Sequence, residues 1–496
     1  MSDLSRLIRN DVPPDRSAIV FDSAVAPSTL TYAELQHQID AVAGGLLERK
    51  LPSGATIAVM AANRPEHIIA YFGILRAGHV AVPINDRLGR DALQHIFAKS
   101  NARLVFADEH SAAKVPAHLP TIGFDDRGAR GWLALMTSSR RHADDIDIAP
   151  ERDAVIMFTS GSTGQPKGVP ITHKGYLWAM RQFEGLRDSI DDRSVLIAAP
   201  LFHMNAQFHI QATLQAGSTA LLMPRFDSAR FIELMRKHEV ARVTGVPTML
   251  ALAVAELERR NAAPIESVQS VALGSAPFSA QLLAQLQYWF PNALVTNGYG
   301  TTETGPGVFG THPRGRPTPP LSVGYPLPDV EVRLLGPEAP ERGVLWVRCP
   351  MLARAYIGAP EQTAASFVDG GYITNDVMTR DEHGFFFFAG RSDDMFVCAG
   401  ENIYPGDVEQ LLLKHPAVRE AAVVPVDDEI KNALPVAFVV ADSPVDETTL
   451  RDFALAEGPA YAHPRAVYFL DQLPLADTKK VDRSMLEAEA RQRFQR

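Results

Sequence analysis

The stretch FTSGSTGQPKG, residues 158–168, gathers glycine, serine and threonine around one lysine, directly after an apolar run. Such a loop exposes successive backbone N–H groups and hydroxyls, and phosphate oxygens are the usual ligand for that surface. Lys167 adds a mobile cation. The residue types therefore indicate a phosphate-binding loop, while composition alone leaves an ordinary surface loop open.

Two common catalytic loops do not fit this stretch. A Walker A loop requires G-x-x-x-x-G-K-[ST], but Gly164 is followed by Gln-Pro-Lys-Gly, and no serine or threonine follows Lys167. The G-x-S-x-G pattern of a nucleophile elbow is also absent from it. The loop is thus expected to bind phosphate without belonging to either class.

Three further motifs follow in order: NGYGTTET at 297–304, GYITNDVMTRDEHGFFFFAGRSDD at 371–394, and LPLADTKKVDR at 473–483. With the loop, they resemble the signatures of the acyl-adenylate-forming superfamily, which contains acyl-CoA synthetases, peptide-synthetase adenylation domains and beetle luciferases. The resemblance runs from about Thr31 to Arg483. It implies an ATP- and Mg²⁺-dependent acid–thiol ligase.

The resemblance assigns roles around the nucleotide. Tyr299 would stack near the adenine, Thr302 would touch a phosphate, and Glu303 would hold Mg²⁺. A carboxylate beside a triphosphate is repelled unless a hard cation lies between them, which agrees with the last role. The implied ATP and AMP contacts are Thr159, Ser160, Gly161, Ser162, Thr163, Gly164, Lys167, Ser275, Ala276, Pro277, Asn297, Gly298, Tyr299, Gly300, Thr301, Asp376 and Arg391.

The second half of the resemblance concerns the ribose and a hinge. Asp376 would accept hydrogen bonds from the ribose hydroxyls, as carboxylates do in other nucleotide sites, and Arg391 would meet the ribose and phosphate region. Asn375 stands where the family usually has glycine. Asp393 matches the hinge position. The loop Ala399, Gly400 and Glu401 would reach the coenzyme A side after a rotation.

Lys480 falls on the catalytic lysine of the family's C-terminal motif. Two departures stand beside it, since Ala476 replaces threonine and Lys479 replaces glycine. By resemblance, Lys480, Lys167 and Mg²⁺ offset the charge when a carboxylate attacks the α-phosphorus of ATP. The acyl-AMP formed would then be attacked by a thiol. The implied catalytic set is Lys480, Glu303, Thr302 and His203.

The acid and the acceptor are only partly constrained. Amino-acid-activating relatives carry an aspartate shortly after the aromatic position of the His203 region, and LFHMNAQFHIQ has no acidic residue, so an α-amino acid is not expected. Coenzyme A is the expected acceptor. The predicted acyl pocket allows an aromatic, short or medium-chain acid and consists of His203, Met204, Asn205, Phe208, Val246, Gly274 and Pro306.

Other functions remain as alternatives. A stand-alone ligase could load an acyl carrier protein instead of coenzyme A, and a luciferase-like oxidase or a non-catalytic binding protein could share the fold. The stretch GPGVFG fits G-x-G-x-x-G, but it carries a proline and opens no clear helix, which disfavours a dinucleotide site. In HMNAQFH no cysteine or carboxylate joins the histidines, so His209 is expected in the core or a pocket wall.

The secondary-structure elements that must position these residues are predicted to alternate between strands and helices. Apolar runs such as ARLVFAD, DAVIMFTSG, SVLIAAP and SVALGSA predict buried strands, and the stretches between them read as helices. Thr31 and Glu34 form a capping-box pattern ahead of a stripe of Leu35, Ile39, Val42, Leu46 and Leu47. Alternation of this kind predicts an α/β fold with mostly parallel sheets covered by helices.

The domain boundaries follow from changes of composition. We predict an N-terminal adenylate-forming domain over 1–392, with a small β-rich subdomain at about 311–392, and a mobile α+β C-terminal domain over 393–496. For 496 residues the usual domain size gives about three units, which agrees with this division.

Bulk composition narrows the partners and the location. The net charge of −10 argues against nucleic acid as the main partner. No signal peptide is apparent, and no apolar run approaches the ~20 residues needed to span a bilayer, so a cytoplasmic location is expected. The two cysteines, Cys349 and Cys398, are expected to be buried and reduced. The sequence leaves open whether the chain forms a homo-oligomer.

Overall fold

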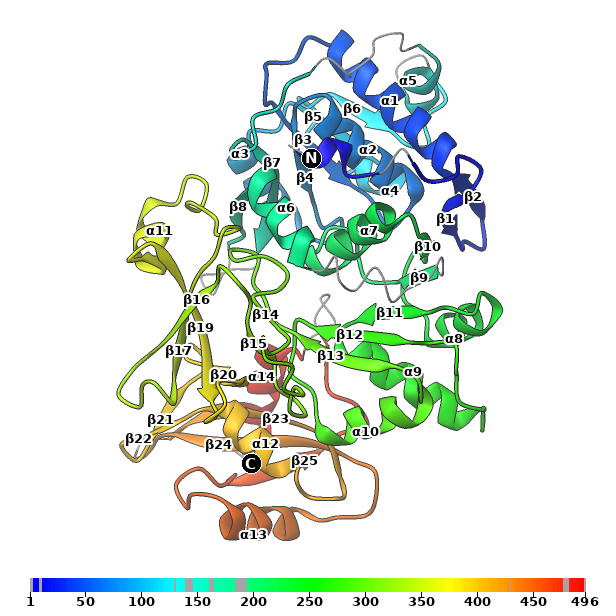
Figure 1. Ribbon diagram of the computed structural model, residues 1–496. Helices are drawn as coiled ribbons and strands as arrows, with labels where there is room; N and C mark the ends of the chain where they lie inside the picture. Colours follow the sequence, from blue (N-terminus) through cyan, green and yellow to red (C-terminus); the bar gives the residue numbers. More distant parts are fainter. Residues whose placement is uncertain are drawn as a thin grey trace.

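The computed structural model describes residues 3–8, 11–128, 131–138, 146–159, 165–182, 194–428, 430–475 and 481–494 (Figure 1). Several residues of the predicted site lie outside these ranges, namely Ser160, Gly161, Ser162, Thr163, Gly164 and Lys480, as do Ala476 and Lys479 beside Lys480. Their predicted roles therefore stay predictions from the sequence.

The N-terminal third folds around a six-stranded sheet in the order β6-β5-β3-β4-β7-β8. Neighbouring strands are parallel except β7 and β8, which pair antiparallel. Its strands are β3 (Thr56–Met60), β4 (Val80–Pro83), β5 (Leu104–Ala107), β6 (Thr121–Gly123), β7 (Asp153–Thr159) and β8 (Lys167–Thr172). The helices of this part are α1 (Tyr32–Glu48), α2 (Pro65–Arg76), α3 (Arg90–Ser100), α4 (Glu109–Ala112), α5 (Trp132–Ser138) and α6 (His173–Gln182).

Helix α1 begins as the sequence predicts. The Thr31 hydroxyl accepts from the Glu34 N–H at 3.2 Å, and the Glu34 carboxylate accepts from the Thr31 N–H at 2.8 Å. This reciprocal capping box is confirmed. Leu35, Ile39 and Val42 are fully buried on one face. Each side chain buried in this way contributes roughly 1.5–3 kcal/mol to stability.

A second, seven-stranded sheet has the order β13-β12-β11-β9-β10-β1-β2, in which only β2 is antiparallel to its neighbour. Its strands are β1 (Ser17–Phe21), β2 (Ser28–Thr31), β9 (Ser194–Ile197), β10 (Thr219–Leu222), β11 (Arg242–Gly245), β12 (Ser270–Gly274) and β13 (Leu294–Gly298). Its helices are α7 (Met204–Ala216), α8 (Ser228–Lys237), α9 (Pro247–Arg259) and α10 (Ala280–Trp289). The short 3-10 helix Leu4–Arg6 near the N-terminus packs beside α2 and α6.

After β13 the chain builds a smaller antiparallel sheet, β16-β17-β19-β18, with β20 paired to β19. Its elements, with the two-stranded ribbon that precedes it, are β14 (Phe309–Gly310), β15 (Tyr325–Pro326), β16 (Glu331–Leu335), β17 (Arg342–Arg348), α11 (Pro360–Ser366), β18 (Phe367–Val368), β19 (Gly371–Arg380) and β20 (Phe386–Arg391). One hydrophobic core extends through all three of these sheets.

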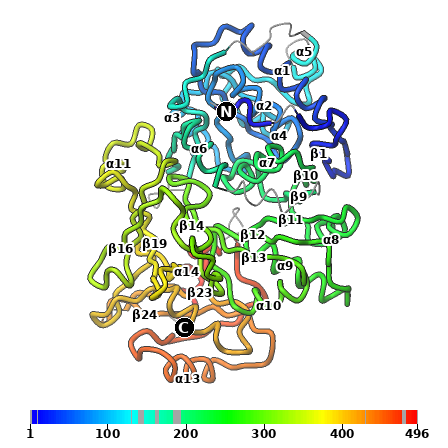
Figure 2. The backbone as a smooth tube through the Cα atoms, viewed as in Figure 1, coloured from blue at the N-terminus to red at the C-terminus, as the bar shows by residue number. Residues whose placement is uncertain are grey.

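The C-terminal part lies at the opposite end from the six-stranded sheet, as the colour sequence of the tube in Figure 2 shows. It has its own hydrophobic clusters around a sheet of order β22-β21-β24-β23, with β25 beside β24. Its elements are β21 (Phe396–Cys398), β22 (Glu401–Ile403), α12 (Pro405–Leu412), β23 (Val418–Asp428), β24 (Asn432–Ala441), α13 (Glu447–Glu457), β25 (Ala466–Phe469) and α14 (Arg483–Phe494).

The α/β fold with mostly parallel sheets is confirmed. Both cysteines are buried and free, as predicted. No helix in the described ranges has the length and apolar character that a membrane span requires.

Candidate active site

The β7–β8 hairpin positions the predicted phosphate loop. Thr159 ends β7 and pairs across the ladder with Lys167, which begins β8, so the loop between them starts at the carboxyl end of a buried strand. Its base is held from outside, because the Ile357 N–H donates to the Gly168 carbonyl at 2.9 Å and His95 Nε2 lies 3.1 Å from the Pro166 carbonyl. Thr159 and Lys167, which flank the predicted loop, thus belong to a fixed stem.

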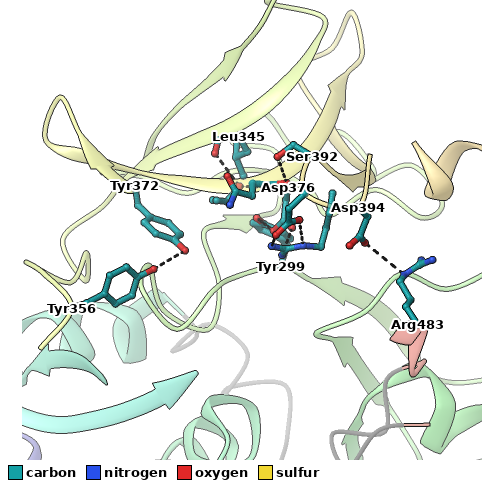
Figure 3. A network of polar contacts seen from close by, with 12 residues as sticks. Tyr299, Leu345, Tyr356, Tyr372, Asp376, Ser392, Asp394 and Arg483 are labelled. Carbon is teal, nitrogen blue, oxygen red and sulfur yellow. Dashed lines mark hydrogen bonds and ion pairs between the residues drawn. The ribbon is translucent and has the colours of Figure 1, made fainter. Parts of the chain in front are cut away.

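Glu303 follows β13 of the other parallel sheet and is 6% exposed. The turn before it needs a glycine, since a Cβ on Gly300 would lie 2.1 Å from the Gly305 carbonyl oxygen. The Tyr356 hydroxyl donates to Glu303 Oε1 at 2.7 Å and lies 3.2 Å from the Tyr372 hydroxyl (Figure 3). Two tyrosines therefore hold the predicted metal-binding carboxylate.

The same tyrosines connect the loop to Glu303. Lys167 Nζ lies 4.9 Å from the centre of the Tyr356 ring, a cation–π distance. Burial and the Glu303 carboxylate raise the pKa of both Tyr356 and Tyr372 above the usual range, so both hydroxyls stay protonated and can donate. Residues from the two parallel sheets and the antiparallel sheet meet at this point.

Asp376 on β19 is buried and is bonded on both oxygens. The Tyr299 hydroxyl donates to Oδ2 at 2.5 Å, and Arg391 on β20 donates to Oδ1 at 3.0 Å. Burial and the Asp376 charge raise the pKa of Tyr299 well above its ordinary value. The carboxylate predicted to meet the ribose is therefore fixed in orientation and paired with a cation (Figure 3).

The backbone explains why Asn375 can stand in the family's glycine position. Asn375 has a φ of 62°, in the left-handed region. Glycine adopts that region freely, and asparagine is among the few other residues that do so at low cost. Its carbonyl accepts from the Ser392 N–H at 2.7 Å and from the Ser392 hydroxyl at 3.1 Å, so this turn also anchors the segment that leaves β20.

The predicted hinge lies between two opposed ion pairs. Arg391 donates twice to Asp393, both bonds at 2.7 Å, and this pairing raises the pKa of Arg391. Burial raises the pKa of Asp394, which lies 3.6 Å from Arg483 of α14. Asp393 and Asp394 thus contact different arginines, Arg391 of β20 and Arg483 of α14. Figure 3 shows the pair of Asp394 and Arg483.

The remaining predicted nucleotide contacts lie at the carboxyl ends of β12 and β13. Gly298 ends β13 beside Gly274 of β12, and the Asn297 side chain donates to the Leu321 carbonyl at 2.9 Å. Ser275 has a φ of 69° and is exposed, and Ala276 and Pro277 follow it. Thr301 bonds Thr304 within the same turn, and Thr302 is half-buried beside them.

The predicted coenzyme A loop belongs to the C-terminal sheet, where it joins β21 to β22. Ala399 and Gly400 form the exposed tip of the β21–β22 hairpin, with φ values of 53° and 87°, and Glu401 follows them. A Cβ on Gly400 would meet no heavy atom within 4 Å. The open space is therefore at Gly400, while the Ala399 N–H donates to the Lys431 carbonyl at 2.9 Å.

The predicted acyl residues cluster between α7 and the sheet. Asn205 on α7 accepts from the Thr244 hydroxyl of β11 at 3.1 Å, and its Nδ2 lies 3.6 Å from where a Gly274 Cβ would be. His203 precedes α7 with its ring 4.6 Å from that of Phe202. Phe208 is 2% exposed and packs against Tyr176, deeper in the core. The other half-buried members are Met204, Val246 and Pro306.

Three site residues were not found from the sequence: Tyr356, Tyr372 and Thr244. Tyr372 stands four residues before Asp376 within a quoted motif, so its place on the same strand was a usable signal. Tyr356 lies 53 residues from Glu303, and nothing in the pattern around it indicates that contact. The contact of Thr244 with Asn205 could not be predicted from the sequence, because it depends on the packing of β11 against α7.

Comparisons with known proteins identify the family of the chain. The AMP-binding enzyme family matches residues 9–357, and the AMP-binding enzyme C-terminal domain matches residues 407–480. The chain belongs to the AMP-binding enzyme family.

Curated relatives cover nearly the whole chain. A feruloyl-CoA synthase of Amycolatopsis sp is 32% identical over 477 residues, covering 94% of each chain. A 2-succinylbenzoate–CoA ligase of Bacillus licheniformis is 31% identical, covering 96% of this chain and 98% of the relative.

Solved structures give the same result. The o-succinylbenzoate CoA synthetase of Bacillus subtilis, in complex with its acyl-adenylate intermediate, has a TM-score of 0.82 at 27% identity, covering 98% of both chains. ATP-bound MatB from Rhodopseudomonas palustris has a TM-score of 0.86 at 26% identity, covering 100% of both.

The chain is thus an acid–thiol ligase of the AMP-forming type, as the sequence predicted. It uses ATP and Mg²⁺ to activate a carboxylic acid as acyl-AMP, and it transfers the acyl group to coenzyme A. The relatives are named as coenzyme A ligases and synthases, which does not favour the alternative of loading a carrier protein.

Proposed function

We propose that the Tyr299–Asp376–Arg391 cluster binds the ribose and that Glu303 is the protein's ligand for Mg²⁺. The observation that carries this assignment is the fixed orientation of Asp376, bonded by Tyr299 at 2.5 Å and by Arg391 at 3.0 Å. A preoriented carboxylate can accept hydroxyl donors without a reorganisation cost. The predicted loop contacts and Lys167 complete the phosphate side.

Glu303 suits a magnesium ion that arrives with the nucleotide. Mg²⁺ prefers oxygen ligands and is commonly bound through one or two carboxylates together with substrate phosphates. Glu303 offers such an oxygen, oriented by Tyr356 at 2.7 Å. The ion would supply charge neutralisation at the phosphates. Tyr356 and Tyr372 act by holding the carboxylate, while Lys167 and Lys480 add positive charge on the protein's side.

In the first half-reaction, a carboxylate oxygen of the acid attacks the α-phosphorus of ATP, the bond from that phosphorus to the bridging oxygen breaks, and pyrophosphate leaves. Two anions must approach each other, so the barrier is largely electrostatic. Lys480 is the proposed cation at the α-phosphate.

In the second half-reaction, the sulfur of coenzyme A attacks the acyl carbon, the carbon–oxygen bond to AMP breaks, and the thiol proton is released. The exposed Ala399–Glu401 hairpin tip and the opposed ion pairs of Asp393 and Asp394 support a rotation of the 393–496 domain between the two steps. Because both half-reactions would use the same site, the reactive acyl-AMP is kept from bulk water.

For the acid we propose an aromatic carboxylate. Ferulate, 4-coumarate and 2-succinylbenzoate, which appear in the names of the relatives, are aromatic acids. The sheet face that meets α7 carries small residues, Thr244, Ala272 and Gly274, which suits a flat ring. A cytoplasmic location is proposed from the need for ATP and coenzyme A and from the two reduced cysteines.

The test is pyrophosphate release by the purified enzyme with ATP, Mg²⁺, coenzyme A and a library of carboxylic acids, followed by mass spectrometry of the thioester. We expect an aromatic acid to give an acyl-CoA product. Release of pyrophosphate with aliphatic acids alone would overturn the acid class. Thioester on a holo carrier protein, with none on coenzyme A, would overturn the acceptor.

A further inference from the structure

Arg242 occupies an unusual place for a charged residue. It begins β11, a strand in the interior of the seven-stranded sheet, between β9 and β12. Residues two apart on a strand share a face, so Arg242 lies on the same face as Thr244. The Thr244 hydroxyl bonds Asn205 of α7 at 3.1 Å, which shows that this face meets α7.

The helix opposite presents His209 at the same level. His209 is one turn after Asn205 and therefore shares its helix face. One helical turn is about 5.4 Å and two strand residues are about 6.6 Å, so the Asn205–Thr244 layer is followed by a His209–Arg242 layer. The charge of Arg242 acts on His209 and, after burial, is the second cause that keeps the pKa of His209 well below its ordinary value.

The guanidinium of Arg242 lacks a compensating group. Its Nε atom is buried without a hydrogen-bond partner, and within the described part of the chain no carboxylate forms an ion pair with it. Burial lowers the pKa of Arg242 to about 10, whereas a neighbouring carboxylate would raise it. A partly buried charge without a counter-ion is incompletely solvated, so an anion that binds there gains a favourable interaction.

This layer lies on the same sheet face as the predicted acyl residues, one layer beyond the hydrogen bond between Asn205 and Thr244. On the same face, Ala272 and Gly274 of β12 lie beside Thr244, and Gly274 pairs with Gly298 of β13, next to Tyr299 of the nucleotide cluster. The side chains between the two ends are small, and Arg242 and His209 both keep partial exposure. Four strand residues separate the levels of Gly274 and Arg242, a span of about 13 Å.

We propose that Arg242 is a specificity-determining residue that binds a second carboxylate, at the end of the acid remote from the reacting carboxyl group, with His209 donating a hydrogen bond to it. The substrate class is then a dicarboxylate, with a spacer of about the length of an aryl-acrylic acid. A neutral hydroxyl at that end would leave the arginine charge uncompensated, so the anion is favoured. This inference rests on the proposed acyl pocket.

The experiment compares acids that differ only at the distal end. Pyrophosphate release is measured with 4-carboxycinnamate, 4-coumarate and cinnamate, and with terephthalate against benzoate and suberate against octanoate. We expect kcat/KM for at least one diacid to exceed that of its monoacid about 100-fold, as for a desolvated charge pair. Arg242→Met should remove this preference while leaving the monoacid rate within a few-fold. Arg242→Lys should restore part of it.

A second readout does not depend on turnover. Thermal unfolding is recorded with each acid but without ATP. The preferred diacid should raise the Tm of the wild-type enzyme and should not raise that of Arg242→Met. The matched control is Arg236→Met, the same change at an exposed position on α8, which should behave as wild type. Arg242→Met alone should unfold at the same temperature or higher, because it removes a buried charge.

Two results would overturn the proposal. One is that no diacid in the three sets is preferred over its monoacid and none stabilises the protein. The other is that Arg242→Met keeps the preference. Failure of the ligase assignment looks different, since no acid would then give pyrophosphate, while the Tm shift would still report on Arg242.

Discussion

The two ends of the site differ in how their charges are balanced. At the nucleotide end, Asp376 is bonded by Tyr299 and Arg391, and Glu303 is bonded by Tyr356, so each carboxylate has a partner within the protein. At the proposed acyl end, Arg242 is half-buried, and its buried Nε atom has no hydrogen-bond partner. On the proposed assignment, the first end has its partners before a ligand arrives, and the second gains its partner from the ligand.

This difference separates catalysis from selectivity. A preorganised end keeps its geometry whichever acid is bound, because its hydrogen bonds are internal. An end with an uncompensated charge discriminates strongly, because an acid that lacks the matching group leaves that charge unpaired. Substitutions at the nucleotide end should therefore slow all acids alike, and substitutions at the acyl end should change their ranking.

The largest effect is expected for Lys480→Ala. Adenylation should fall about 1,000-fold with every acid, since the proposed cation at the α-phosphate is lost. Thioester formation from preformed acyl-AMP should fall far less. The two half-reactions are measured separately, by pyrophosphate release and by thiolysis of synthetic acyl-AMP. Lys479→Gly is the control and should be tolerated. Equal losses in the two half-reactions, or loss of adenylation in the control, would contradict the assignment.

Next comes Asp376→Asn, which keeps the size but removes the charge that pairs with Arg391. We expect kcat/KM for ATP to fall about 100-fold with no change in the ranking of the acids. Steady-state kinetics with two different acids measure this. A loss of kcat/KM that differed between the two acids would contradict the division of catalysis and selectivity between the two ends. Circular dichroism should show an unchanged fold.

Tyr372→Phe should act through Glu303. Removal of the hydroxyl that supports Tyr356 and Glu303 should weaken Mg²⁺ binding about 30-fold, as for other groups that orient a metal ligand. Titration of activity with Mg²⁺ and spectroscopic titration of Mn²⁺ with a non-hydrolysable ATP analogue both report it. Tyr288→Phe, at an exposed position, is the matched control. A lower rate with unchanged metal affinity would contradict this role.

The smallest effect is expected for Gly274→Ala at the acyl end. The added Cβ would lie 3.2 Å from the Gly298 carbonyl and 3.6 Å from Asn205 Nδ2, so it narrows the space without left-handed strain. Ring-bearing acids should lose about 10-fold in kcat/KM relative to short aliphatic acids, with KM for ATP unchanged. Gly89→Ala, whose Cβ would meet nothing within 4 Å, is the control. A uniform loss for all acids would place Gly274 at the nucleotide end instead.

Local patterns predicted much of the fold. The capping box at Thr31, the buried stripe of α1 and the runs that form β5, β7, β9 and β12 depend on neighbours in sequence, and the structure has them. Strand β8 was not predicted, because its short run after the loop carries a glycine and a proline. The number of sheets was not predicted either, since strand order depends on which strands pair and not on any single run.

The sequence by itself determined the class of chemistry. The loop at 158–168, the motifs at 297–304 and 371–394 and the stretch at 473–483 resemble the acyl-adenylate-forming superfamily, and this resemblance implied nucleotide activation. Only the tertiary structure decided the partners: Tyr356 meets Glu303 across 53 residues, and Asn205 meets Thr244 across 39. The periodicity of apolar residues indicates which face of a strand or helix is buried. The order of the strands in the sheet decides which other element packs against that face. For this reason only the structure shows that Arg242, which looks ordinary in sequence, is half-buried near His209 with its Nε atom unbonded.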